Sequence, residues 1–128
     1  MTRTAKCCCG AASVTVKGNP HLNGICHCND CKRRTGSAFG WSAYFAEEQV
    51  LEMSGDWTSY EPEAQPGQVR RACKQCSSML WWTTPQIAGI GLAGGAFLNP
   101  PLPEPTGSYQ HADHVPWFDV PNDWDRLS

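Results

Sequence analysis

Eight cysteines lie in three short clusters along this chain of 128 residues. The clusters read Cys7-Cys8-Cys9, Cys26-His27-Cys28-Asn29-Asp30-Cys31 and Cys73-Lys74-Gln75-Cys76. Because the first residues contain no apolar stretch of signal-peptide length, we expect a cytoplasmic protein. Cytoplasmic thiols stay reduced, so clustered cysteines there bind metal ions more often than they form disulfides. The sequence therefore predicts a fold organised around metal-binding thiolates.

The first and third clusters predict a closed metal site. A Cys-x2-Cys pair directs two sulfurs at one cation from a tight turn, and a Cys-x-Cys pair does so from an extended segment. Four soft ligands complete the tetrahedron of a structural zinc ion, and this chain supplies them as Cys7, Cys9, Cys73 and Cys76. Such a site can contribute on the order of 10 kcal/mol of apparent folding free energy. Cys8 should point away from its neighbours as a packed or spare thiol.

The middle cluster predicts a second zinc ion with an open position. Cys26, Cys28 and Cys31 can reach one ion together, and three protein ligands are the pattern of catalytic zinc. Zinc with three thiolates carries about one negative charge, by formal counting. Such a site is a poor source of hydroxide, but it suits an incoming thiol, whose proton becomes easier to lose. We therefore predict these three cysteines as a catalytic site.

The surroundings of the middle cluster leave several roles open. Lys32, Arg33 and Arg34 could offset thiolate charge, hold a carboxylate of a small acidic ligand, or form a solvated face. The cluster could instead be a second structural site, completed by His27, Cys8 or a distant histidine. Reversible disulfides are a third reading, although an i,i+2 bridge has poor geometry. His27 lies between two ligands and should point away from the metal. No general base is identifiable; His27, His111 and His114 are candidates by residue type alone.

Period-two patterns predict an all-β fold, because no segment carries a sustained helical stripe. A short helix over 30–34 is compatible with the sequence, and the prolines of residues 99–107 exclude a helix and most sheet pairing there. We expect one domain over 1–128, with most of the six tryptophans in its core and one or two lining a pocket. Strands are predicted over Ser13–Lys17, Phe39–Phe45, Val50–Met53, Trp57–Tyr60, Gln68–Ala72, Met79–Thr83 and, with glycine interruptions, Ile87–Leu98.

Composition narrows the class of protein further. The net charge of −2 argues against broad nucleic-acid binding, which needs a basic surface. With 41% hydrophobic and 17% charged residues, neither disorder nor a membrane span is expected. Exposed strand edges would allow a homo-oligomer, which the pattern does not require.

The segment from Cys26 to Phe39 resembles the signature of a known family. It reads Cys-His-Cys-Asn-Asp-Cys-Lys-Arg-Arg-Thr-Gly-Ser-Ala-Phe and is similar to that of the glutathione-dependent formaldehyde-activating enzymes, a family that includes centromere protein V. The Cys7-x-Cys9-Gly10-Ala11 and Cys73-x2-Cys76 motifs stand where this family has its other motifs. The stretch from Pro116 to Pro121 resembles its C-terminal motif. The resemblance therefore spans nearly the whole chain.

This resemblance implies a β-tent fold of twisted antiparallel sheets with zinc-ribbon-like knuckles. It also implies a structural zinc on Cys7, Cys9, Cys73 and Cys76 and a catalytic zinc on Cys26, Cys28 and Cys31. The implied activity is that of a carbon–sulfur lyase, which joins formaldehyde to glutathione as S-hydroxymethylglutathione. The expected partners are a small thiol such as glutathione and a small electrophile. Because the family includes centromere protein V, a non-catalytic zinc module that binds a protein partner is the alternative.

The chain departs from the family pattern at two places. Ser77 follows Cys76 where the family often has glycine, and serine fits less well if that position needs a positive φ. Residues 107–115 replace a run that often reads His-Ile-aromatic. A functional role carried by that run therefore does not transfer to this chain.

Overall fold

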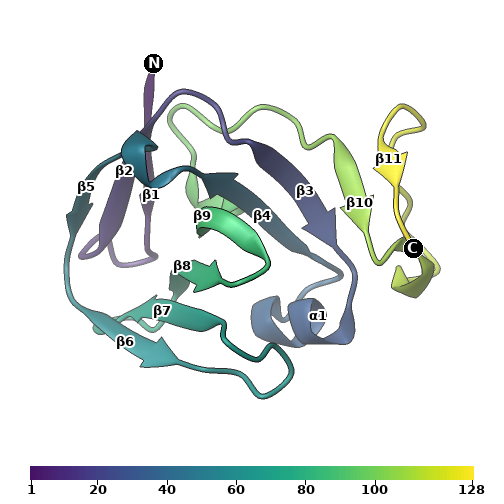
Figure 1. The fold of residues 1–128 in the computed structure, drawn as a ribbon, viewed down its shortest axis with the longest axis horizontal. Coiled ribbons are helices and arrows are strands. Elements are labelled where there is room, and N and C mark those ends of the chain that lie inside the picture. Colours follow the sequence, from purple (N-terminus) through teal and green to yellow (C-terminus); the bar gives the residue numbers. More distant parts are fainter.

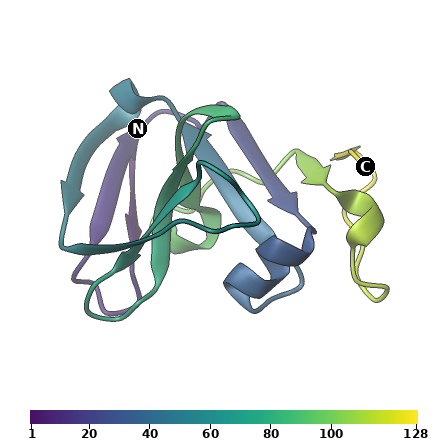
Figure 2. The ribbon, with the colours of Figure 1, turned by 60° about the horizontal axis from the view of Figure 1, so that its bottom comes forward.

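Two β-sheets form the fold in the computed structural model, which describes residues 1–128 (Figure 1). The smaller sheet has the strand order β1-β2-β5, and the larger has the order β11-β10-β3-β4-β9-β8-β7-β6. The small sheet lies at one side of the large one, while β10 and β11 lie at the opposite side (Figures 1 and 2). The strands are β1 (Thr2–Lys6), β2 (Ser13–Lys17), β3 (Leu22–Cys26), β4 (Gly40–Phe45), β5 (Val50–Ser54), β6 (Trp57–Tyr60), β7 (Val69–Cys73), β8 (Met79–Thr84), β9 (Ile87–Ala93), β10 (Gly107–Tyr109) and β11 (Asp125–Arg126).

Helical structure is short and lies between strands. The one α-helix, α1 (Asn29–Thr35), connects β3 to β4, and single 3₁₀ turns cover Glu47–Gln49, Gly94–Ala96 and His111–Asp113. None of these helices has the length and apolar character needed to cross a bilayer.

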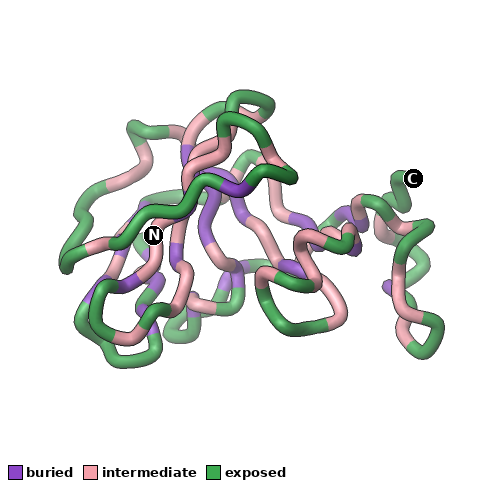
Figure 3. Tube along the Cα trace, turned by 90° about the horizontal axis from the view of Figure 1, so that it is seen from below, coloured by how far each residue is buried: buried purple, intermediate pink, exposed green.

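The main core lies between the two sheets. Val14 and Val16 of β2 are fully buried and belong to the same cluster as Phe45 of β4 and Leu92 of β9. Figure 3 shows the buried segments gathered in the middle of the molecule. Since side chains alternate along a strand, the other face of β4 is free for a different task. Ser42 and Tyr44 on that face line a cavity, described below.

The all-β prediction is confirmed, and most predicted strands are present. The short helix predicted over 30–34 is α1, and the strand predicted over Ile87–Leu98 ends at Ala93, where a 3₁₀ turn begins. The sequence did not predict β1, β3, β10 or β11. The expectation of antiparallel sheets is too simple, because β10 runs parallel to both β3 and β11.

The tryptophans differ from their predicted place in the core. Only Trp82 is buried, and it lines the cavity, in agreement with the expectation that one or two tryptophans line a pocket. Trp41, Trp57 and Trp81 pack against the core from its margin, while Trp117 is 77% exposed. The centre of the core is filled by aliphatic side chains and by two phenylalanines, Phe45 and Phe97, so the larger indole rings lie at its margin.

Candidate metal centres and the adjoining cavity

The four sulfurs of the first and third clusters lie together. The sulfurs of Cys7, Cys9, Cys73 and Cys76 are all within 4.8 Å of one another. The Sγ atoms of Cys7 and Cys9 are 3.6 Å apart, and those of Cys9 and Cys73 are 3.8 Å apart. A zinc tetrahedron with bonds of about 2.3 Å has sulfur–sulfur edges of about 3.8 Å. All eight cysteines of the chain are free thiols, so this group fits a metal ion rather than a disulfide pair.

The cluster joins the two sheets. Cys73 ends β7 of the large sheet, whereas Cys7 and Cys9 follow β1 of the small sheet. The Cys7–Cys9 segment was expected to be extended, but it forms the turn between β1 and β2, in which the Gly10 amide donates to the Cys7 carbonyl at 3.1 Å. A turn also brings sulfurs two residues apart to one point. Cys8 is exposed outside the cluster, as its place between two ligands predicted.

The turn after Cys76 has the conformation that the glycine of the family pattern would favour. Ser77 has φ of +67°. Its amide donates to the Cys73 carbonyl at 2.8 Å, which closes the Cys-x2-Cys turn. The departure from the family pattern at this position therefore places an L-residue in the left-handed region.

We expect Ser77→Gly to stabilise the metal-loaded chain by up to about 1 kcal/mol, because relief of the left-handed strain exceeds the entropy that glycine adds to the unfolded chain. The thermal unfolding midpoint of the loaded protein measures this gain. Ser37→Gly is the matched control, because Ser37 is also exposed but has no positive φ. A lower midpoint for Ser77→Gly would contradict the strain argument.

The middle cluster forms a separate group of three sulfurs. Those of Cys26, Cys28 and Cys31 lie within 4.8 Å of one another, and no fourth cysteine, histidine or carboxylate joins them. Cys26 ends β3, while Cys28 caps the N-terminus of α1 by accepting a hydrogen bond from the Cys31 amide at 3.3 Å. Gly36 ends the helix with φ of +64°. Strand end and helix start thus place the three sulfurs at one point.

The thiols of the two clusters differ in pKa, because each is surrounded by different hydrogen-bond partners. Hydrogen bonds from Cys26 and then Cys28 lower the pKa of Cys31 to about 5, and the guanidinium of Arg34 adds to this shift. The same bond to Cys31, together with burial, raises the pKa of Cys26. In the other cluster a bond from the Ser78 hydroxyl lowers the pKa of Cys76 to about 5. These shifts favour the thiolate form at Cys31 in one cluster and at Cys76 in the other.

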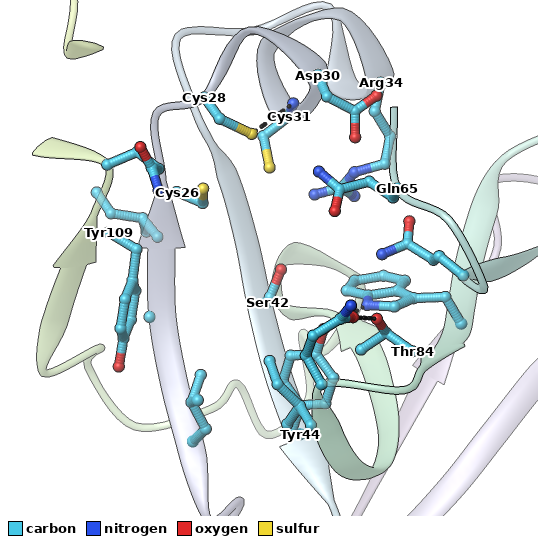
Figure 4. Close-up of a pocket in the computed structure, with 18 of the residues that line it drawn as sticks. Cys26, Cys28, Asp30, Cys31, Arg34, Ser42, Tyr44, Gln65, Thr84 and Tyr109 are labelled. Atoms are coloured by element: carbon cyan, nitrogen blue, oxygen red, sulfur yellow. Dashed lines mark hydrogen bonds between the residues drawn. The ribbon is translucent and has the colours of Figure 1, made fainter. Parts of the chain in front are cut away.

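A cavity of about 320 Å³ lies beside the three-sulfur cluster (Figure 4). This volume is at the lower end of the range for small-molecule sites. The three cysteines lie at one end, below α1, and the face of β4 with Ser42 and Tyr44 lies across from them. The Trp82 indole donates to the Tyr44 hydroxyl at 2.8 Å, which fixes both rings in the wall. The cavity therefore combines thiol ligands with a rigid aromatic surface.

Two arginines line the cavity, and they differ in whether a carboxylate already pairs with them. Arg70, whose side chain is 8% exposed, forms an ion pair with Asp30 of α1 and also donates to Gln68 at 2.6 Å. Arg34 forms no ion pair with a carboxylate and instead lies 4.9 Å above the ring centre of Trp82. Arg34 is therefore the cation in the cavity that can still pair with an anionic ligand.

The basic residues predicted to bind a ligand divide into three positions. Only Arg34 lines the cavity. Arg33 is exposed, and the Lys32 ammonium donates to the Asp113 carbonyl at 2.5 Å. Carboxylate binding by Lys32, Arg33 and Arg34 stays a prediction, and Arg34 is the one of the three placed for it.

The histidines lie away from the cavity, which none of them lines. His27 points away from the sulfurs, as predicted, and its buried ring bonds to the Ser108 hydroxyl at 2.8 Å. His111 bonds to the same hydroxyl from the other side at 2.7 Å. The candidates for a general base named from residue type therefore have no contact with the cavity.

Several cavity residues were not identified from the sequence. The alternation along β4 placed Ser42 and Tyr44 on a second face, which was a usable signal. Asp30 lies inside the Cys26–Cys31 motif and could have been noted there. Nothing in the sequence indicated that Gln65 and Gln68, from the segment between β6 and β7, would line this cavity.

The comparison with protein families gave one result. The family model described as glutathione-dependent formaldehyde-activating enzyme matches residues 2–110. No curated protein matched the chain. The matched range contains all eight cysteines and every residue that lines the cavity. It ends before Pro116–Pro121, so it does not test the resemblance in that stretch.

Proposed function

Since the chain belongs to the glutathione-dependent formaldehyde-activating enzyme family, we propose that it is a zinc-dependent carbon–sulfur lyase acting on a thiol adduct. The thiol is glutathione or a related small thiol, and the electrophile is formaldehyde or a similar small carbonyl compound. In the synthetic direction the sulfur bonds to the carbonyl carbon, the C=O π bond breaks, and the thiol proton ends on the oxygen. The observation that carries this proposal is a cluster of only three thiols at the end of a cavity.

The donor sets suit zinc at both clusters. Thiolates are soft ligands that zinc prefers, and their number predicts a closed structural site and an open catalytic one. Zinc on Cys26, Cys28 and Cys31 would leave one position for an outside ligand and would favour the thiolate form of a bound thiol. We place the enzyme in the cytoplasm, where these ligands stay reduced.

The side chains of the cavity would bind and orient the thiol. Arg34 is placed to pair with a carboxylate while it also offsets the charge of Cys31. The amides of Gln65, Gln68 and Gln86 can bond to peptide groups of the ligand. Holding the thiol and the electrophile side by side supplies most of the acceleration, because the reaction becomes effectively unimolecular.

Titration of the zinc-loaded protein with glutathione tests this function. X-ray absorption at the zinc edge should show an added sulfur ligand from solution, and exchange NMR should show faster formation of the formaldehyde adduct. S-methylglutathione is the control ligand, because it lacks an ionisable thiol. Absence of any response to glutathione and other small thiols would overturn the proposal and favour the alternative, a zinc module that binds a protein partner.

We expect Arg34→Gln to weaken thiol binding by roughly 10- to 100-fold, the range for loss of a charge-assisted hydrogen bond. The dissociation constant for glutathione measures this effect. Arg33→Gln removes the same charge from the exposed neighbour and should leave binding almost unchanged. Equal effects of the two variants would contradict the assigned position of the carboxylate and would indicate a diffuse charge effect instead.

A further inference from the structure

We propose a third metal site, formed by His111, His114 and Asp119, that binds a divalent cation suited to imidazole and carboxylate ligands. One potential ligand atom from each residue lies within 4.8 Å of the others. None of the three lines the cavity or belongs to a cysteine cluster. The site is thus separate from the proposed lyase chemistry and does not depend on it.

The local backbone explains why the two imidazoles meet. His111 begins a 3₁₀ turn, and His114 is the residue that follows its end. Because a 3₁₀ helix has three residues per turn, side chains at i and i+3 point in the same direction. The two rings accordingly stack, with centres 4.5 Å apart and planes within 13°. The His-x2-His spacing therefore places the two imidazoles side by side. Because stacked rings aim their in-plane lone pairs in nearly parallel directions, one ring has to turn out of the stack for both to bind one ion.

Hydrogen bonds fix which nitrogens remain available. His114 bonds through Nδ1 to the His111 carbonyl at 2.7 Å. A carbonyl only accepts, so Nδ1 carries the proton and Nε2 keeps a free lone pair. His111 bonds through Nδ1 to Ser108 and presents Nε2 to the Asp119 carboxylate. Ligation through one ring nitrogen while the other is held by a hydrogen bond is the usual arrangement of metal-binding histidines.

Distance and charge at Asp119 agree with a cation site. Its Oδ1 lies 3.4 Å from Nε2 of His111. A tetrahedral zinc site with bonds of about 2.0–2.1 Å has edges of about 3.4 Å. The Val120 amide donates to the same Oδ1 at 2.8 Å, which orients the carboxylate. The side chain is 63% exposed, so an ion can enter from solvent.

A plain structural role is the competing explanation. Ser108 links His27 to His111, and Asp119 also lies 3.5 Å from the Arg126 guanidinium. These contacts could serve only to attach the C-terminal segment to β3. An exposed ion pair of this length contributes little, however, and a divalent cation could displace it.

The test is a calorimetric titration of the protein whose two cysteine clusters are already loaded with zinc. We expect one further equivalent of zinc to bind, and His114→Gln to weaken this step at least about 10-fold. His21→Gln is the matched control, because His21 is exposed and bonds to a different segment. The proposal would be overturned if the unmodified chain bound no further equivalent of zinc. It would also be overturned if the His114→Gln variant bound that equivalent as tightly as the unmodified chain.

A second measurement on the unmodified chain removes any dependence on the folding of the variant. Addition of Co²⁺ to the zinc-loaded protein should broaden the imidazole NMR signals of His111 and His114 first, while those of His21 remain sharp. Simultaneous broadening of all three would indicate non-specific binding and would count against the site.

Discussion

Replacing Cys73 with serine is expected to unfold most of the zinc-loaded chain. Cys73 is 2% exposed, and its sulfur lies 3.8 Å from that of Cys9. The cluster joins β7 of the large sheet to the turn after β1, so loss of the metal separates the two sheets that enclose the core. A structural zinc site of this type contributes on the order of 10 kcal/mol. That is comparable to the entire stability of an ordinary domain, about 5–15 kcal/mol.

Amide NMR dispersion and zinc content per chain measure this outcome together. The unmodified chain should hold two zinc ions in its cysteine clusters, and the variant should lose dispersion along with metal. Cys8→Ser is the matched control, because Cys8 is exposed between two predicted ligands but outside the cluster. A folded Cys73→Ser variant that keeps both sheets would show that the core alone suffices.

The cysteine clusters could be predicted because the geometry of a metal site is local. Three thiols within six residues reach one ion wherever the chain turns inside the motif, as it does here between the end of β3 and the start of α1, and a Cys-x2-Cys turn does the same. Pairing Cys7 and Cys9 with Cys73 and Cys76 needed only the ligand count of zinc. The Cys7–Cys9 backbone was misjudged as extended, yet the sulfurs still converge.

The strands around the cavity were harder to predict because their sequences lack a regular alternation of apolar and polar residues. In β3, Gly24 breaks the apolar alternation, since a Cβ there would lie 2.4 Å from the ring of Tyr109. Where β8 pairs with β7, Trp81 lies opposite Arg71 but Met79 lies opposite Ala72, so the register shifts at Leu80 of β8. Leu80 packs in the core, whereas Trp82 lines the cavity. Regular alternation would place Leu80 and Trp82 on one face. A register shift leaves no reliable trace in the sequence.

Replacing Cys28 with serine is expected to abolish thiol binding and to lower the rate of adduct formation by a factor of about 100 or more. The three-sulfur cluster would lose a ligand, while a serine hydroxyl can still accept the bond from the Cys31 amide that begins α1. This cluster lies outside the main core and α1 buries no residue, so the fold should persist. The substitution thus separates chemistry from stability, in contrast to Cys73→Ser.

Three measurements on one preparation test the prediction for Cys28→Ser: the zinc content, the thermal unfolding midpoint and the rate of adduct formation. We expect one zinc ion fewer, a nearly unchanged midpoint and loss of rate. Asn29→Ala is the matched control, because Asn29 is exposed beside the ligand and offers no sulfur. If Cys28→Ser unfolded the chain as fully as Cys73→Ser, both clusters would be structural and the open position at Cys26, Cys28 and Cys31 would have no catalytic meaning. A folded variant that loses zinc but keeps its rate would remove the metal from the reaction, because the remaining side chains of the cavity would then suffice to bring thiol and electrophile together.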